Sequence, residues 1–429
     1  MFQTIVNAFK IKEVRRKIFI TIALLFVYRL GCYIPVPGVQ AFDGLSDFTF
    51  LQIMSAVSGG ALSQGTLFAM GIGPYINASI IIQLLTVGIP ALERLSKQGE
   101  EGKRKINNIT RILTLFLAIA QAIGIIVAFR TSIKTEYLFG TTKFLKLLSY
   151  AFLVIVYTAG AALTMWLGER ITDYGVSNGV SLLIFAGILS TAGTAILSLI
   201  ENLFVAELAM SAAWQLIGFV LVAIVIFGAI VAVNDAERKI PVQYAKQVKG
   251  RKMYGGQSTH IPIKINASGV MPLIFSFSIL SFPDLVMNLF GYQPKSWYKD
   301  VFGTGGWAYM VLLCLLILFF SYFYNQIQFN PDDISKSIQG NGGFIPGTRP
   351  GKPTADYLRR VSNRITLFGA IFLAILALVP SLLFKAIGGE TLMNVFSATG
   401  LLIIVSVALE FEQALQSQIM MKNYKGFLK

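Results

Sequence analysis

The sequence predicts an all-α membrane protein whose ten transmembrane helices form two five-helix halves of opposite orientation. Three observations carry this prediction. Of the 429 residues, 55% are hydrophobic and only 13% are charged, against about 25% charged in soluble proteins. The apolar residues gather in runs of about 20, the length that crosses a bilayer core. Most of the Lys and Arg residues lie on one side of those runs.

The apolar runs follow one another at nearly even spacing, so each is assigned one span. The predicted spans cover residues 18–37, 74–92, 109–129, 147–167, 180–199, 212–233, 267–287, 308–326, 366–386 and 391–411. An even number of spans places both termini on one side of the membrane. A division near 200–212 gives an N-terminal half, 1–205, and a C-terminal half, 206–429. Five spans per half force the halves into opposite orientations, as in inverted repeats.

The charge distribution predicts which side faces the cytoplasm. Loops on the side of the N-terminus carry 28 of the 36 Lys and Arg residues, and those on the opposite side carry 7. The formal net charge of +15 therefore lies wholly on the N-terminal side. Because cytoplasmic loops carry the excess of Lys and Arg, both termini are predicted to be cytoplasmic. The first apolar run is too long for a cleaved signal peptide and has no clean small-residue cleavage site.

One apolar segment between the first and second spans is too short to cross. Residues 57–70 read VSGGALSQGTLFAM, and Gly71, Gly73 and Pro74 interrupt any helix before the second span begins. Two structures fit this composition: a short helix that re-enters from the outer side, or an interfacial helix on the outer surface. The residues alone leave both open.

Two cytoplasmic loops are long. The loop 234–265 is predicted as strand–turn–strand, with IPVQYAKQV and STHIPIKI flanking the turn KGRKMYGG. The loop 327–365 has the tip GNGGFIPGTRPGKPT, too rich in Gly and Pro for a helix. Long ordered loops are usually functional. A basic loop that serves only to fix the topology could account for one of them. It accounts less well for two.

The sequence offers few residues for catalysis or metal binding. Its two cysteines, Cys32 and Cys314, lie inside apolar runs, and His260 is the one histidine. A disulfide framework, a thiolate or histidine metal site and a Ser-His-Asp triad are therefore disfavoured. The GxxxxGK[ST] phosphate loop is missing, so energy must come from a partner. We expect no bound cofactor and no enzymatic activity.

Ionisable residues inside the spans are scarce, although an ion-coupled transporter or an intramembrane protease needs them. Arg29 is the one charge well inside a span, and we expect it to reach the interface or join a structural ion pair. Glu169 and Asp173 lie one helical turn apart, and we interpret them as a solvated helix end. The rival function is a ten-span transporter for a small solute. A third, an intramembrane hydrolase, lacks a nucleophile–base set.

Several motifs, in this order across residues 20–420, agree with one family. They are YRLGCYIPVPG (28–38), GIGPYINASIIIQLL (71–85), KQGEEGKRKINNITR (97–111), LGERITDYGVSNG (167–179), RKIPVQYAKQV (238–248), GGQSTHIPIKINASGVMPLIF (255–275) and PGTRPGKPT (346–354). Each is weak alone, but together they make the sequence closely resemble the bacterial SecY family, the channel subunits of the protein translocon. The motif LGERITDYGVSNG and the final tail differ in detail from the commonest versions.

The resemblance implies a fold in which spans 1–5 and 6–10 close like a clamshell. It implies that the segment near 57–70 is a plug helix, which would include Gly60, Ala61, Leu62, Gly65, Leu67 and Phe68. It also implies a constriction lined by isoleucines, which by motif position are Ile76, Ile80, Ile184, Ile188, Ile274 and Ile403. Helical spacing supports two pairs, Ile76 with Ile80 and Ile184 with Ile188, because residues i and i+4 share one face of a helix. Any single isoleucine, taken alone, is better explained as lipid-facing or core.

The resemblance also implies a lateral gate between spans 2–3 and spans 7–8. Ser79, Gln121 and Ser276 are the polar candidates at that seam. Release there is a partition: a leucine contributes about −0.5 kcal/mol and a charge costs about +3 kcal/mol on the insertion scale. A hydrophobic segment would therefore leave sideways into lipid, whereas a charged one would pass through.

The partners that the resemblance implies are the membrane subunits SecE and SecG, the ATPase SecA and the ribosome. The substrate would be an unfolded preprotein with its signal sequence. Basic residues in the two long loops are the expected docking sites: Arg251, Lys252, Arg349 and Lys352. Clustered Lys and Arg suit RNA phosphates or an acidic protein face. Generic positive-inside charge remains an alternative for any single lysine, and Arg349 is favoured because Pro and Gly hold it on a stiff tip.

Overall fold

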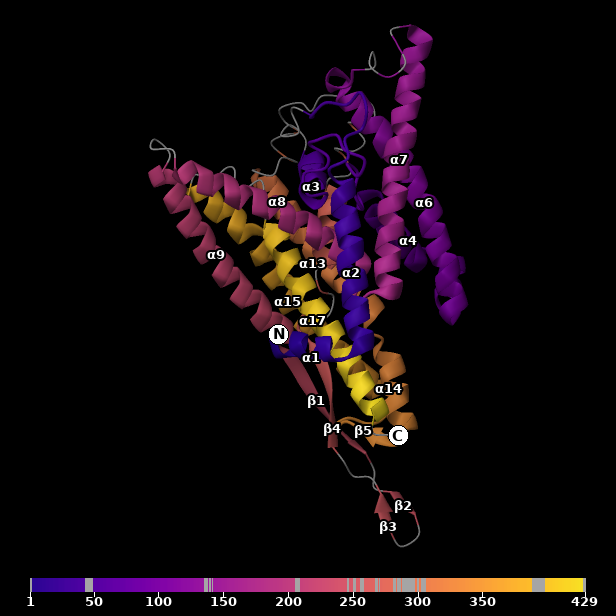
Figure 1. The fold of residues 1–429 in the computed structure, drawn as a ribbon. Coiled ribbons are helices and arrows are strands. Elements are labelled where there is room, and N and C mark those ends of the chain that lie inside the picture. The colour runs from indigo at the N-terminus through magenta and orange to yellow at the C-terminus, as the bar shows by residue number, and fades with distance from the viewer. Residues whose placement is uncertain are drawn as a thin grey trace.

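The computed structural model describes residues 2–42, 49–134, 142–204, 209–244, 247–249, 252–254, 258–266, 271–280, 306–387 and 398–426, and single positions between these ranges. The molecule is a bundle of long helices with a small β-structure at one end (Figure 1). Both chain termini lie at the end that carries this β-structure (Figure 1). This common end agrees with an even number of membrane crossings.

The helices of the N-terminal part carry most of the contacts described below. They are α1 (Phe2–Lys10), α2 (Lys12–Gly31), α3 (Thr49–Val57), α4 (Gly73–Gly88), α5 (Pro90–Ser96), α6 (Gly99–Ala128), α7 (Lys143–Tyr174) and α8 (Gly179–Leu203). A short 3-10 helix spans Arg130–Ser132. At 1.5 Å per residue, the 32 residues of α7 reach about 48 Å, well beyond the roughly 30 Å hydrocarbon core.

The C-terminal part alternates long helices with short strands. Its elements are α9 (Ala209–Asp235), β1 (Glu237–Tyr244), β2 (Gln247–Lys249), β3 (Lys252–Tyr254), β4 (Ser258–Lys264), α10 (Met271–Leu280), α13 (Trp307–Gln328), α14 (Pro331–Gly340), β5 (Gly343–Phe344), α15 (Lys352–Ile387) and α17 (Ala398–Gly426). The helix α17 continues through the tail to residue 426, which the sequence left undecided between helix and disorder.

Within the described ranges, six helices are long and apolar enough to cross a membrane, or seven if α4 and α5 count as one broken span. The chain is therefore a multi-pass membrane protein, while the count of ten spans stays a prediction. The predicted spans 267–287 and 391–411 both include positions that are not described. The first predicted span, 18–37, extends too far, because α2 ends at Gly31 ahead of Pro35 and Pro37.

The helices α4 and α5 meet at an angle of 105°. Ile89 between them has an extended backbone (φ −109°, ψ 113°) and Pro90 begins α5. A residue that precedes proline is pushed out of the helical region, so the sequence itself stops the second span at Gly88. The predicted span, 74–92, included this bend.

The two long loops form one small sheet, in the order β4-β1-β5. The strands β1 and β4 pair antiparallel from Glu237 opposite Lys264 to Gln243 opposite Ser258, as the prediction requires. The predicted turn 249–256 was wrong in part, because β3 and the last residue of β2 lie within it. The strand β5 comes from the second loop and pairs with β1 through Phe344 opposite Gln243, which the sequence did not indicate. Their shared core holds Ile240, Val242, Ile263, Ile338, Ile345 and Leu358.

The tip of the second loop is non-helical only in part. Residues 341–351 are outside any helix, but Gly340 ends α14 and residues 352–354 form the first turn of α15. The expectation of a non-helical tip over 340–354 was wrong at both ends. The proline at 353 explains one of them, because the first turn of a helix tolerates a residue without an N–H group.

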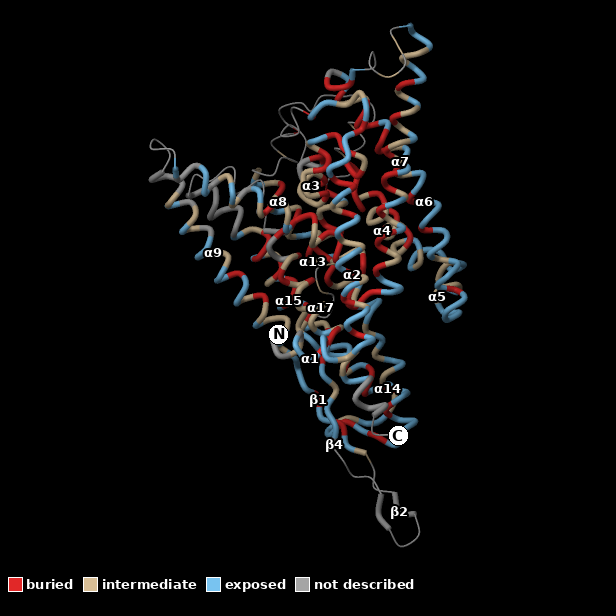
Figure 2. The backbone as a smooth tube through the Cα atoms, viewed as in Figure 1, coloured by how far each residue is buried: buried red, intermediate tan, exposed pale blue. Residues whose placement is uncertain are grey.

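Buried residues concentrate in the interior of the bundle, and α9 at one edge is largely exposed (Figure 2). Only 18% of the most apolar stretch of α9, within Leu216–Asp235, is buried. Large apolar side chains such as Ile224 on α9 and Phe26 on α2 are more than half exposed. An apolar helix face this open suits lipid as its solvent.

Candidate functional site

The segment that follows α3 is a chain of turns rather than a helix. The prediction of a short helix near 57–70 was therefore wrong. The helix α3 ends at Val57, and the residues after it form turns as far as Ile72. Gly59, Gly60, Gly65 and Gly71 have φ of 70°, 82°, 59° and 52°. Only glycine adopts such angles routinely, so four glycines in thirteen residues prevent a regular helix here. We call residues 57–72 the turn segment.

Three helices close around the turn segment by means of glycines. A Cβ atom on Gly187 of α8 would collide with the carbonyl oxygen of Val57, and one on Gly160 of α7 with that of Leu67. A Cβ on Gly31 of α2 would strike the ring of Phe68. At these glycines α7 and α8 come close to the backbone of the turn segment, and α2 comes close to the Phe68 ring. Such close contact is possible because glycine has no side chain.

Two threonines hold the backbone of this region. The hydroxyl of Thr164 on α7 donates to the carbonyl oxygen of Gly71 at 2.7 Å. The hydroxyl of Thr191 on α8 donates to the carbonyl oxygen of Ala56 at 3.0 Å. Hydrogen bonds to buried carbonyl groups replace those that a turn cannot make to itself. The position of the turn segment is therefore specified by polar as well as apolar contacts.

Arg29 lies against the same segment. Its guanidinium donates to the hydroxyl groups of Ser190 and Tyr33 and lies 5.4 Å from the centre of the Tyr33 ring. A Cβ atom on Gly59 would collide with it. The contacts of Arg29 are therefore hydrogen bonds and a cation–ring contact. The ion pair that was one expectation is not found among the described residues.

The six predicted constriction residues lie in two adjoining apolar clusters, one of which includes residues of the turn segment. Ile184, Ile188 and Ile403 are buried in one apolar cluster with Ala61 and Phe68 of the turn segment. Two more, Ile76 and Ile274, pack against it. The sixth, Ile80, belongs to an adjoining cluster that Ile76 and Ile274 also contact. Residues from α4, α8, α10 and α17 thus belong to two adjoining apolar clusters, and their role as a constriction stays a prediction.

The remaining predicted plug residues divide between two surroundings. Leu67 packs against the cluster of the constriction residues. Leu62 is completely buried in a different cluster, with Val36, Met54 and Met70. Gly60 and Gly65 supply two of the left-handed turns. The turn segment therefore contributes to two apolar clusters. One holds Ile184, Ile188 and Ile403, and the other is formed with α6 and α7.

The adjoining cluster marks where α4 meets α10 and α13, which we call the front seam. Its buried members are Ile80, Phe275, Phe320 and Tyr324. Across it, the hydroxyl of Tyr324 on α13 donates to the side-chain carbonyl of Gln83 on α4. The sequence analysis missed this pair. The signal was the single amide in the run IIIQLL, three residues after Ile80.

The polar candidates for a lateral gate are not joined by the hydrogen bonds described. The hydroxyl of Ser276 donates at 2.7 Å to the carbonyl oxygen of Pro272 in its own helix. Gln121 is only 4% exposed, and neither amide atom has a hydrogen-bond partner in the described chain. Ser79 is half-buried on α4. Their assignment to a gate stays a prediction.

A second contact between the N-terminal and C-terminal parts is made by α17, which packs against α1, α2 and α8; we call this contact the rear seam. Ile403 and Val407 lie in the constriction cluster, and Leu415 is buried with Ala8, Val14, Ile18 and Val176. The side-chain amide of Gln418 donates to the carbonyl oxygen of Val176 at 3.0 Å. One helix thereby joins residues of the N-terminal part along several turns.

The predicted docking residues lie at the end with the β-structure. Arg349 is exposed between β5 and α15, flanked by Gly347 and Gly351 with φ of 83° and 93°. Lys352 is exposed at the start of α15. Lys252 lies in β3, opposite Lys249 of β2. Arg251 lies outside the described residues. The structure thus holds Arg349 on a tip whose backbone requires glycine.

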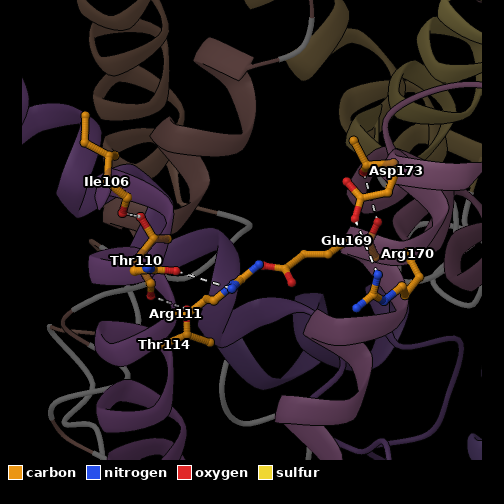
Figure 3. Close-up of polar contacts among 10 residues, drawn as sticks. Ile106, Thr110, Arg111, Thr114, Glu169, Arg170 and Asp173 are labelled. Carbon is orange, nitrogen blue, oxygen red and sulfur yellow. Dashed lines mark hydrogen bonds and ion pairs between the residues drawn. The ribbon is translucent and has the colours of Figure 1, made fainter. Parts of the chain in front are cut away.

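The carboxylates of the motif GERITD do not pair with each other (Figure 3). Glu169 on α7 accepts a hydrogen bond from Arg111 on α6 at 2.7 Å, and Asp173 lies 3.8 Å from Arg170. Arg170 also lies over the rings of Trp166 and Tyr174. Each carboxylate has its own cation, which agrees with a solvated helix end rather than a catalytic pair. Among the described residues, no group of His, Cys, Asp and Glu could hold a metal ion.

Comparisons with known proteins agree with one family. The SecY family model matches residues 66–412. The protein translocase subunit SecY of Streptomyces griseus is 42% identical over 451 positions, covering 100% of both chains. That of Staphylococcus aureus is 39% identical over 437 positions, covering 100% of this chain and 99% of the relative.

Two solved structures share the fold. A protein-conducting channel superposes with a TM-score of 0.70 at 20% identity, covering 94% of this chain and 92% of that one. Sec61 in the canine ribosome-channel complex superposes with a TM-score of 0.64 at 18% identity, with the same coverage. Identity as low as this concerns the fold alone, whereas the curated relatives match over their whole length. The chain belongs to the SecY family.

Proposed function

We propose that this protein is a channel through which unfolded polypeptides cross the bacterial cytoplasmic membrane, and from which transmembrane segments leave sideways into lipid. The observation that supports the proposal is the pair of adjoining apolar clusters that contain the six isoleucines. These residues come from four helices in both parts of the chain, and Ala61 and Phe68 of the turn segment are buried in the first cluster. The arrangement suits a closed pore better than a solute-binding pocket.

An apolar constriction explains how such a channel closes. A narrow ring of branched side chains excludes water and therefore resists ions. It yields to an extended chain, because isoleucine side chains offer no hydrogen bonds that would retain a passing polar segment. Two residues of the turn segment, Ala61 and Phe68, pack on the ring. In the proposed mechanism the turn segment is the plug, and it must leave before a chain can pass.

Sideways release requires the two halves, 1–205 and 206–429, to part along one side. The front seam is the proposed gate, because it brings α4 against α10 and α13 next to the clusters of isoleucines. The rear seam is the proposed hinge. A segment held at the front seam partitions between lipid and the aqueous path, so its hydrophobicity decides its fate. Ser79, Gln121 and Ser276 remain candidate gate residues.

The driver would dock at the end with the β-structure, which would face the cytoplasm together with both termini. Relatives in fold are seen bound to ribosomes, in canine and yeast complexes. The exposed tip with Arg349 and Lys352, and the β2–β3 hairpin with Arg251 and Lys252, are the proposed contacts for the ribosome or SecA. Membrane partners corresponding to SecE and SecG are part of the proposal. The channel itself catalyses no reaction, and its partner supplies the energy.

A crosslinking experiment tests the pore. Cys32 and Cys314 are replaced, and one cysteine is introduced at Ile80 or Ile274. A stalled secretory chain carrying its own cysteine is then offered with SecA and ATP. We expect a disulfide at either position and none at the control Ile224→Cys, whose side chain is 67% exposed on α9. The proposal fails if SecA binds but no crosslink forms, which would favour a solute transporter.

A further inference from the structure

Basic residues gather where α6 passes into α7, at the end of the bundle opposite the β-structure (Figure 1). The segment 130–146 carries four Lys and Arg residues and one acidic residue. We propose that Arg130, Lys143 and Lys146 bind the phosphate group of an anionic phospholipid in the outer leaflet of the membrane. The leaflet follows from the proposed topology, in which the end with the β-structure faces the cytoplasm.

Two polar contacts between α6 and α7 give the depth of this site. At one end, Arg111 on α6 donates to the carboxylate of Glu169 on α7 at 2.7 Å. At the other, the guanidinium carbon of Arg130 lies 5.8 Å from the centre of the Tyr150 ring. The contacts are 19 positions apart along both segments, from 111 to 130 and from 150 to 169, a helical rise of about 28 Å. This rise is close to the roughly 30 Å of a hydrocarbon core, so the second contact lies at phosphate level.

The three cations lie around one face of α7. Lys143, Lys146 and Tyr150 occupy positions i, i+3 and i+7, so they share a face of the helix. Arg130 reaches that face through the Tyr150 ring. Arg130 and Lys143 are exposed, and Lys146 is half-buried. Within the part of the chain that the structure describes, no carboxylate forms an ion pair with any of the three. The charge of a lipid phosphate would complement this face.

The apolar neighbours of the cations favour a lipid over a soluble anion. Phe144 and Leu147, on the same turns of α7 as the two lysines, are 71% and 67% exposed. At the edge of the hydrocarbon core these side chains would pack on acyl chains, while the lysine stems extend along them and keep the ammonium groups at the phosphates. The half-buried Tyr150 is of the residue type that gathers at this interface. A soluble anion would engage the charges alone.

The test measures which lipid lies beside Leu147. Full-length protein with Cys32 and Cys314 replaced carries a fluorophore on Leu147→Cys and is reconstituted in nanodiscs of phosphatidylcholine and phosphatidylglycerol. The same quenching spin label is placed near the start of one acyl chain, on either lipid in turn. We expect phosphatidylglycerol to be enriched roughly fivefold or more over its bulk share, the ratio that corresponds to about 1 kcal/mol for a cation near the surface. Raising the salt from about 0.1 M to about 1 M should reduce this enrichment.

Charge variants assign the enrichment to the cations. Arg130→Gln combined with Lys146→Gln should return the lipid beside Leu147 to its bulk composition. Arg130→Lys combined with Lys146→Arg, which keeps both charges, should retain the enrichment. Equal quenching by the two lipids in the parent protein would overturn the site, and so would an enrichment that survives the double glutamine variant.

A matched position separates this site from the general attraction of a basic protein for anionic lipid. Ile217 on α9 is 53% exposed and lies 18 positions from Asp235 at the other end of its helix, a rise of about 27 Å. A fluorophore on Ile217→Cys should be quenched equally by both lipids in every variant. Equal enrichment at Ile217 and Leu147 would overturn the site. These measurements need no polypeptide transport, so a failure of the proposed function would leave the lipid site standing.

Discussion

The two seams between the halves differ in how they are held. At the rear seam, α17 runs along α1, α2 and α8, and the contact passes through two apolar clusters, from Ile403 to Leu415. At the front seam, α4 meets α10 and α13 through one aromatic cluster and the Gln83–Tyr324 hydrogen bond. The rear contact is long and continuous, whereas the front contact is local.

The difference shows how a membrane protein can open on one side without falling apart. Burial of apolar surface stabilises helix contacts in proportion to the packed area, so a long contact resists separation more than a local one. A force that separates the halves should therefore part the front seam first and use the rear seam as its hinge.

The largest expected effect tests the rear seam. Leu415→Ala should destabilise the protein by about 2–5 kcal/mol, because it removes a buried side chain and leaves a cavity among Ala8, Val14, Ile18 and Val176. Thermal unfolding of the purified protein in detergent measures this. The ratio of released to translocated segments should not change in the molecules that remain folded. An increase in that ratio would show that the rear seam also gates.

The second prediction tests the seat of the turn segment. Gly187→Ala places a methyl group against the backbone of Val57, and overpacking of this kind costs about 1–3 kcal/mol. We expect the turn segment to be displaced and the closed channel to leak ions, measured as conductance across a planar bilayer.

The chain supplies a matched control for this substitution. Gly193 lies on the same helix, and a Cβ built there meets nothing within 4 Å. Gly193→Ala should leave conductance unchanged and stabilise the helix by up to about 1 kcal/mol. Equal leakage from both variants would contradict the proposed seat.

A smaller effect is expected from the hydrogen bond of the turn segment to α7. Thr164→Val removes the donor to Gly71 and should weaken the closed state by about 0.5–1.5 kcal/mol. The readout is a leak below that of Gly187→Ala in the same bilayer assay. Thr158→Val on the same helix is the control, because the Thr158 hydroxyl has no hydrogen-bond partner in the described chain. A leak from the control alone would show that the bond does not hold the segment.

The smallest effect belongs to the ion pair between α6 and α7, which lies at neither seam. Glu169→Gln should lower stability by no more than about 1 kcal/mol, because Arg111 and Glu169 are partly exposed and water screens them. Thermal unfolding at low and high salt checks this, with salt reducing the difference between parent and variant. A change in sideways release would mean that the gate extends beyond α4, α10 and α13.

Some features of the site followed from short motifs. The strand–turn–strand of the first loop follows from alternation and turn residues, and its register places Ile240 and Ile263 in one core. The position of the isoleucines followed from the family resemblance, since an isoleucine taken alone carries no such information. The turn segment was predicted as a helix because its apolar composition outweighed Gly59, Gly60 and Gly65. Their positive φ angles show that the glycines decided the structure.

What the sequence by itself determined is the membrane class, while the ten spans and the side that carries the charge stay predictions. These depend on run length and local charge, because a bilayer selects helices of about 20 apolar residues whatever their neighbours. Only the tertiary structure decided that β5 completes the sheet of a distant loop, that Gln83 meets Tyr324, and that Ile184, Ile188 and Ile403 share one apolar cluster. Such contacts join residues tens to hundreds of positions apart. They depend on how helices pack, and no local pattern encodes that packing.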